Sequence, residues 1–362
     1  MPKNDSCHLE CIDGIKGILC FVLAFFWHYR HFCKPPAVPF YNIFPVSYDR
    51  GYLIVEFFFI LSGFGMMSGY GRKVLNHEIT FPEYIMKRIK KLYPLFLLST
   101  FVVILLEILI HHKTGDFFVY PNFDLYHLVL NLLLLQNGLL ETGWSFNSPS
   151  WVISVLVILY VLFYLICYRS KKVSNVYYAF IICAILGCAI KLSDIDGPLV
   201  NILVGRGLSG FSVGVLMYGV YKKLDSFNSK RLGYFFLAFL AIAYFLVRTN
   251  RMHYIGDIIL LVILAIAPML LFCALSIQWI SRILSLKCFI ILGKISIAVY
   301  LLHFPVQCLF KCVNEYVAPL DFSSYYLWIC YVIVTLCLAS LYTFVISRSY
   351  EPWLMKYFCK RS

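Results

Sequence analysis

Apolar residues along this chain gather into runs of about twenty, separated by short polar stretches. A helix rises about 1.5 Å per residue, so each run is long enough to cross a hydrocarbon core about 30 Å thick. The pattern predicts an all-α fold, a polytopic membrane bundle of about ten transmembrane helices. The predicted spans cover 15–33, 51–71, 92–112, 148–168, 173–192, 199–221, 231–248, 254–276, 288–312 and 323–347.

Two further stretches break this pattern. The apolar piece 125–140 is short for a span and carries several polar residues, so it is either a span or a re-entrant segment. The segment 80–91, TFPEYIMKRIKK, is amphipathic, with Thr80 suited to cap a helix and Pro82 suited to its first turn. We expect this segment to be a cytoplasmic amphipathic helix that binds anionic lipid, the phosphates of a soluble ligand, or both.

The placement of basic residues favours one topology. If 125–140 does not cross, most of the 31 Lys and Arg residues fall on the side that holds the N-terminus. If it does cross, the later loops change sides and the asymmetry collapses. The positive-inside bias therefore predicts a multi-pass protein with both termini in the cytoplasm and 125–140 on the outer side.

Composition supports a single membrane domain, 1–362, with a cytoplasmic N-terminal segment 1–13 and a cytoplasmic tail 348–362. The chain is 61% hydrophobic, and its net charge of +13 lies in the loops between spans, which argues against nucleic acid as a partner. The 14 Cys are scattered, without a CxxC pair or zinc spacing, so we expect reduced cysteines and no metal site. The chain also lacks a P-loop, a GxSxG motif and an HExxH motif.

Ionisable residues inside predicted spans are the main candidates for function. Lys16 opens the first span, and His28 follows twelve residues later, roughly 18 Å along the axis. His303 lies at a similar depth in another span, so the two imidazoles could frame one site. Each could equally be a hydrogen-bonded core histidine, and His28 could belong to an interfacial aromatic belt. A neutral imidazole is suited to take a proton from an alcohol.

Three charged residues and two glycines complete this picture. Glu56, early in the second span, could orient a histidine or form a salt bridge, and Gly63 and Gly65 allow close helix approach. Arg206, between glycines, needs an anion: Glu56, Glu107 or a ligand group. We expect Glu107, near the end of the third span, to be a snorkelling residue at the membrane interface.

Five segments, taken together and in this order, resemble the blocks typical of the acyltransferase-3 family of integral membrane acyltransferases. They are IDGIKGILCFVLAFFWHY (12–29), GYLIVEFFFILSGF (51–64), FPEYIMKRIKKLYP (81–94), NSPSWVISVLVILYVLF (147–163) and LGKISIAVYLLHFPV (292–306).

The resemblance implies about ten helices and an acyl group, commonly acetyl, delivered from cytoplasmic acetyl-CoA. Acyl-CoA would be a donor substrate, with no permanently bound cofactor. The acceptor would be a sugar hydroxyl on a glycan or glycolipid outside, and a bacterial plasma (inner) membrane would be the setting. The family's membrane histidine would be His28 and its basic residue would be Lys16, while the basic run would map to Lys87, Arg88 and Lys91.

The chain departs from the family pattern in several places. The family usually has Arg where this chain has Lys16, and its histidine follows after eleven residues rather than twelve. The extra residue turns the helix by about 100°, although His31 fits the pattern less well. A Glu usually follows the tryptophan block, where this chain has Leu156 and Val157. The extracytoplasmic esterase-like domain of some members is missing, which predicts a stand-alone transferase.

These observations lead to a mechanistic hypothesis. Lys16, Lys87, Arg88 and Lys91 would hold the phosphates of acyl-CoA, with Arg206 lining the groove or meeting the acceptor. His28 would be the general base or a transient acyl carrier, with Glu56 orienting it and His303 beside it. Trp151 could stack on a sugar ring, with Ser154 also in the substrate site, although a packed indole is an equal alternative for Trp151.

Two other classes of protein share these features. A secondary transporter or flippase would also bury Arg, Glu and His in glycine-rich helices, although it would require alternating access. Release of free CoA on turnover would exclude a pure transporter. A structural membrane subunit would tolerate neutralisation of Lys16 and His28.

Overall fold

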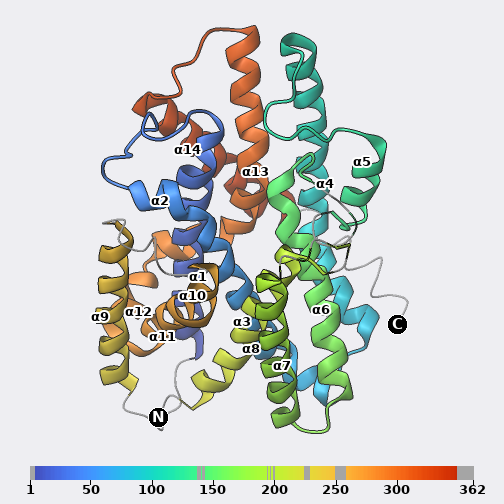
Figure 1. Ribbon diagram of the computed structural model, residues 1–362, viewed down its shortest axis with the longest axis vertical. Coiled ribbons are helices and arrows are strands. Elements are labelled where there is room, and N and C mark those ends of the chain that lie inside the picture. Colours follow the sequence, from blue (N-terminus) through green and yellow to red (C-terminus); the bar gives the residue numbers. More distant parts are fainter. Residues whose placement is uncertain are drawn as a thin grey trace.

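The computed structural model describes residues 5–136, 140, 143–193, 195, 197–198, 200–223, 229–248 and 258–348. These residues form helices joined by loops, and none of them belongs to a β-strand (Figure 1). The prediction of an all-α membrane bundle is confirmed. Nine helical stretches among the described residues are long and apolar enough to cross a membrane.

The described residues include a helix at each of the ten predicted spans. The helix that is not among these nine stretches is α9, which has 20 residues and corresponds to the predicted span 231–248. The helices are α1 (Asp5–Val22), α2 (Pro45–Arg50), α3 (Ile54–Leu75), α4 (Phe81–Thr114), α5 (Leu125–Leu132), α6 (Trp151–Arg169), α7 (Val173–Leu192), α8 (Ile202–Lys222), α9 (Ser229–Arg248), α10 (Ile258–Leu261), α11 (Ala267–Ser276), α12 (Gln278–Leu284), α13 (Lys287–Tyr316) and α14 (Tyr325–Leu341). Short turns of other geometry extend several of them: η1 (Leu23–Trp27), η2 (His28–His31), η3 (Gly51–Leu53), η4 (Ser148–Ser150), η7 (Val262–Ile266) and η8 (Tyr342–Ile346).

The amphipathic segment is the first part of α4 rather than a separate helix. α4 has 34 residues and runs without a break through Pro94, so it rises about 51 Å. Thr80 is its N-cap and Pro82 lies in its first turn, as expected, although the Thr80 side chain makes no capping hydrogen bond. The ends of α4 and α13 extend beyond the other helices at the top of Figure 1.

The helix in the short segment 125–140 is too short to cross. α5 has eight residues and rises only about 12 Å, which agrees with a non-crossing segment. Polar residues of the segment 125–140 hold it against the chain that enters α6. Asn131 donates to the Ser145 hydroxyl at 2.8 Å, and Gln136 donates to the Ser150 hydroxyl at 3.3 Å.

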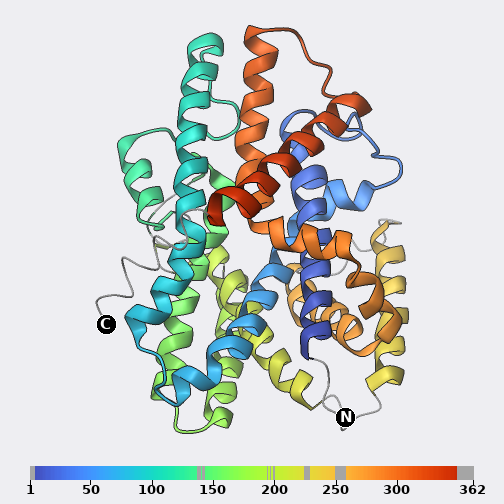
Figure 2. The same ribbon diagram turned by 180° about the vertical axis from the view of Figure 1, so that it is seen from behind.

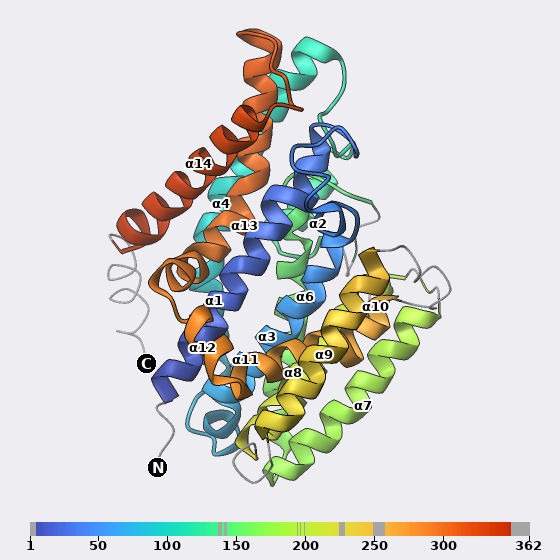
Figure 3. The same cartoon turned by 90° about the vertical axis from the view of Figure 1, so that its left-hand side faces the viewer.

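Close contacts between helices build the centre of the bundle. A Cβ added at Gly63 would lie 1.9 Å from the Phe211 carbonyl oxygen, so glycine is what lets α3 approach α8. Gly65 does not have this role, because a Cβ there would meet nothing within 4 Å. α14 lies diagonally across α13 (Figures 2 and 3), and its Trp328 and Tyr331 donate to the carbonyl oxygens of η1.

Candidate active site

Two cavities lie one above the other inside the bundle. The first has a volume of about 330 Å³ and contains Lys16 and Arg88, and we call it the basic cavity. The second has a volume of about 240 Å³ and contains His28, His31 and Arg206, and we call it the histidine cavity. Successive turns of α1 with η1, α3, α6 and α13 line first one cavity and then the other.

The basic cavity combines two cations with a largely apolar wall. Lys16 bonds Asp13 at 2.8 Å and keeps 27% of its side chain exposed. The Arg88 guanidinium lies over the Tyr70 ring, 4.4 Å from its centroid, and bonds the Tyr70 hydroxyl. The Nε of Arg88 is buried and has no hydrogen-bond partner among the described residues. A buried donor of this kind is unfavourable unless a ligand satisfies it, and phosphate oxygens would do so.

The other members of the basic run do not reach this cavity. Lys87 lies on the exposed face of α4 and pairs with Glu83 at 2.9 Å. The side chain of Lys91 lies outside the described part of the chain. Of the three residues predicted from the run 87–91, Arg88 is therefore the one that the structure brings to a cavity.

Two imidazoles, His28 and His31, line the histidine cavity, and a third, His303, packs on His28 without lining the cavity itself. His28 and His31 are the first and last residues of the 3₁₀ turn η2, in which residues three apart eclipse each other, and their ring centroids lie 5.5 Å apart. The His303 ring stacks on the His28 ring at 4.6 Å with an interplanar angle of 18°. The stacking places the two rings at one depth, as the sequence suggested, while their role in one site stays a prediction.

Hydrogen bonds hold these rings in place. His303 Nδ1 donates to the Tyr300 carbonyl oxygen at 2.7 Å, so its Nε2 is the basic nitrogen, and that atom has no partner among the described residues. Gln307 accepts from His31 Nδ1 at 2.8 Å and donates to the backbone oxygen of His28 at 2.8 Å. His28 Nδ1 is likewise buried without a described partner. The site thus contains ring nitrogens that can accept a proton.

A π-helical turn resolves the spacing discrepancy between Lys16 and His28. In η1 the His28 backbone N–H bonds the Leu23 carbonyl five residues back, instead of four, so the turn absorbs one extra residue. The twelve-residue spacing therefore places His28 at about the azimuth that eleven residues would give in an uninterrupted α-helix. The carbonyl oxygens of Ala24 and Phe25 in this turn accept bonds from α14.

Glu56 and Arg206 form a buried ion pair beside the histidine cavity. Glu56 is fully buried, and its Oε1 accepts from Arg206 Nη2 at 2.5 Å and from Arg206 Nε at 2.6 Å. Arg206 lines the cavity and lies 5.4 Å from the centroid of Trp151, which also lines it. The sequence left Glu56, Glu107 or a ligand group as the anion for Arg206, and in the structure Arg206 pairs with Glu56.

Ser154 is turned away from both cavities. Its buried hydroxyl bonds the backbone oxygens of Gln136 and Trp151. This places Ser154 where α6 meets the end of the segment that contains α5. Its described contacts are therefore structural.

Aromatic rings make up much of the histidine cavity. The sequence analysis identified Trp151 but missed the other members, because nothing distinguishes them in a chain that is 18% aromatic. Flat apolar faces with polar edges suit a sugar ring, and Arg206 adds a planar hydrogen-bond donor. The aromatic lining residues are Trp27, Tyr52, Tyr120, Trp144, Trp151 and Tyr300.

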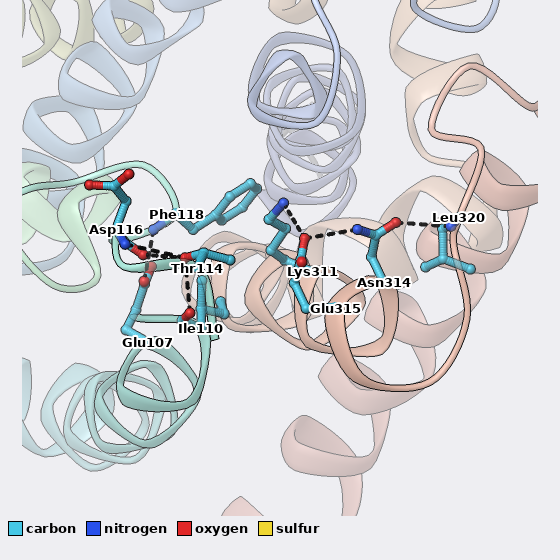
Figure 4. A network of polar contacts seen from close by, with 9 residues as sticks. All are labelled: Glu107, Ile110, Thr114, Asp116, Phe118, Lys311, Asn314, Glu315 and Leu320. Atoms are coloured by element: carbon cyan, nitrogen blue, oxygen red, sulfur yellow. Dashed lines mark hydrogen bonds and ion pairs between the residues drawn. The ribbon is translucent and has the colours of Figure 1, made fainter. Parts of the chain in front are cut away.

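Glu107 fixes the loop that carries Tyr120. The prediction of a snorkelling residue is wrong, because Glu107 is 2% exposed and α4 continues past it for two turns. Its carboxylate accepts from the Phe118 backbone N–H at 3.0 Å (Figure 4). It also accepts from the Cys308 thiol at 3.6 Å. Tyr120, two residues farther on, packs against His31 at 5.9 Å. Burial raises the pKa of the Tyr120 phenol above its usual value, so this side chain is neutral.

The chain is similar in sequence to two proteins, one of which is named as a putative acetyltransferase. A protein of Acidianus two-tailed virus named "Putative acetyltransferase ORF330" is 25% identical over 288 residues, which is 77% of this chain and 82% of that protein. "Protein 2 in picA locus" of Rhizobium radiobacter is 38% identical over 88 residues, which is 24% of this chain and 40% of that protein. No solved structure matches the chain.

The family model described as an acyltransferase domain matches residues 9–344. The match runs from α1 to η8 and includes both cavities. The protein belongs to the acyltransferase-3 family of membrane acyltransferases.

Proposed function

We propose that this protein transfers an acetyl group from cytoplasmic acetyl-CoA to a hydroxyl of an extracytoplasmic glycan or glycolipid. The observation that carries the proposal is the contact between the two cavities. One has cations and an apolar wall, the other has imidazoles and aromatic rings, and they share Val55 and Tyr300 as lining residues. A donor and an acceptor that enter from opposite sides of a membrane would meet there.

The donor would occupy the basic cavity. Lys16 and Arg88 would bind phosphate groups, with the unsatisfied Arg88 Nε as one donor. The pantetheine arm would lie along the aliphatic wall and point its thioester toward Tyr300. Lys87 faces away from this cavity and has no place in the donor site. The basic surface favours the cytoplasm for this end, which would also place both termini inside. The bacterial plasma membrane is the setting that the resemblance to the family implies.

The acceptor would occupy the histidine cavity. A pyranose ring would stack on Trp151 or another ring of the aromatic wall, while Arg206 would donate to its hydroxyl groups. Glu56 would hold Arg206 in place and balance its charge, because an unpaired arginine would be costly at this depth.

His28 would act as the general base. It would take the proton of the acceptor hydroxyl as the oxygen attacks the thioester carbon. The tetrahedral intermediate would collapse with cleavage of the carbon–sulfur bond, and His28 would return the proton to the departing CoA thiolate. His303 would keep the His28 ring oriented by stacking on it.

Reconstituted protein tests this proposal. Vesicles with [¹⁴C]acetyl-CoA at the basic end and oligosaccharides from cell-envelope glycan at the other should yield labelled, alkali-labile glycan esters and an equal amount of free CoA. Movement of unmodified acceptor across the membrane without CoA release would instead indicate a transporter.

A further inference from the structure

The two cavities are divided by a single aromatic side chain and a valine. Tyr300 of α13 and Val55 of α3 line both cavities, whereas every other residue lines one of them. Around this level, Cys20 faces the basic cavity and Leu23 the histidine cavity, one turn apart. On the α1–η1 segment, the change from one cavity to the other therefore falls within about one turn.

Tyr300 is held at this boundary from both of its ends. Its hydroxyl donates to the Pro149 carbonyl oxygen in η4, the turn that leads into Trp151. Its own carbonyl oxygen accepts the His303 Nδ1 hydrogen at 2.7 Å, and its ring lies 5.9 Å from the His303 ring. The Val55 side chain cannot form a hydrogen bond. Of the two boundary side chains, Tyr300 is therefore the one whose position depends on a hydrogen bond.

A boundary is physically necessary in a membrane protein with this arrangement. Lys16 and His28 are separated by most of the hydrocarbon thickness, so joined cavities would form a polar path through it. Such a path would leak protons and small ions. It would also admit water to a bound thioester, and enzymes suppress such side reactions by excluding water.

We propose that Tyr300 is a closable partition, held shut by its hydrogen bond to Pro149 and displaced when the acyl arm of the donor reaches the boundary. The barrier role stands on the cavities alone. The displacement by an acyl arm rests on the proposed function.

A leak assay tests the barrier without any acyl transfer. Purified protein is reconstituted in vesicles that contain a pH-sensitive dye, and proton entry is followed after a pH step. Tyr300→Ala should raise the leak several-fold over wild type, and Tyr300→Phe, which keeps the ring but loses the tether, should give a smaller rise. A matched control is Tyr164→Ala, since Tyr164 is buried, donates to the Ile79 carbonyl and lines neither cavity. A leak in Tyr300→Ala no greater than in Tyr164→Ala would overturn the proposal.

A second assay tests the displacement. CoA release from acetyl-CoA is measured without any acceptor. Tyr300→Ala should raise this uncoupled hydrolysis while transfer to glycan falls, and Tyr300→Phe should raise it less. If the leak rises but uncoupled release does not, the barrier stands and the link to the acyl arm is wrong. If wild-type protein releases no CoA even with acceptor, the proposed function fails instead.

Discussion

The basic cavity and the histidine cavity share four central helical segments, α1 with η1, α3, α6 and α13, but have different chemistry. In the basic cavity, two cations stand at one end of a wall of aliphatic side chains, a surface that selects for charge and length. In the histidine cavity, six aromatic residues and three imidazole or guanidinium groups surround a smaller volume, a surface that selects for shape and hydrogen bonding. Because shape and directed hydrogen bonds fix a ligand's orientation, we infer that orientation of the reactants depends mainly on the histidine cavity.

The largest effect is expected from His28→Ala. Loss of a general base lowers a rate by about 10²- to 10⁴-fold, so transfer should nearly cease while acetyl-CoA still binds. Turnover and calorimetric binding of CoA check the two parts separately. His112→Ala, an exposed histidine in the last turn of α4, is the matched control. Wild-type turnover in His28→Ala would refute the assignment.

The basic cavity should respond to Arg88→Ala. A hydrogen bond to a charged group contributes about 1.5–3 kcal/mol, so the KM for the donor should rise about 10- to 100-fold with a smaller change in kcat. Lys87→Ala removes the adjacent cation, which faces away from the cavity, and should leave the donor KM unchanged. Equal effects of the two substitutions would mean that the basic surface, rather than the cavity, binds the donor.

A smaller effect is expected from filling the basic cavity. Gly65 lines it, and a Cβ there would meet nothing within 4 Å, so Gly65→Leu adds bulk without a backbone clash. The cavity can absorb part of the added side chain, so the crowding cost should lie at the low end of the usual range, about 1–1.4 kcal/mol, and the donor KM should rise about five- to tenfold. The control is Gly69→Leu on the same helix, where a Cβ is equally free but no cavity is lined. Initial rates at varied acetyl-CoA distinguish them, and indistinguishable rates would place the donor elsewhere.

The sequence predicted the charged and histidine residues of the two cavities better than the boundary between the cavities. Lys16 and His28 stood out because ionisable residues are rare inside apolar runs, and their unusual spacing was the signal of the π-turn η1. Tyr300 carried no such signal, as one of 27 tyrosines in an apolar chain. Its importance arises only where α13 passes η4 in space. The role of Glu107 was misjudged because depth was inferred from the end of an apolar run, whereas α4 continues beyond that point.

Glu107 offers the smallest predicted effect and tests whether the histidine cavity depends on its loop. Glu107→Ala removes the acceptor of the Phe118 N–H, which frees the segment that holds Tyr120 against His31. A hydrogen bond contributes about 0.5–1.5 kcal/mol, so the KM for the acceptor should rise about two- to tenfold while the donor KM stays the same. Glu107→Gln keeps an oxygen for the Phe118 N–H and should behave like wild type. If both variants raised the donor KM instead, the two cavities would not divide their substrates as proposed, because a loop at one end would be controlling the other.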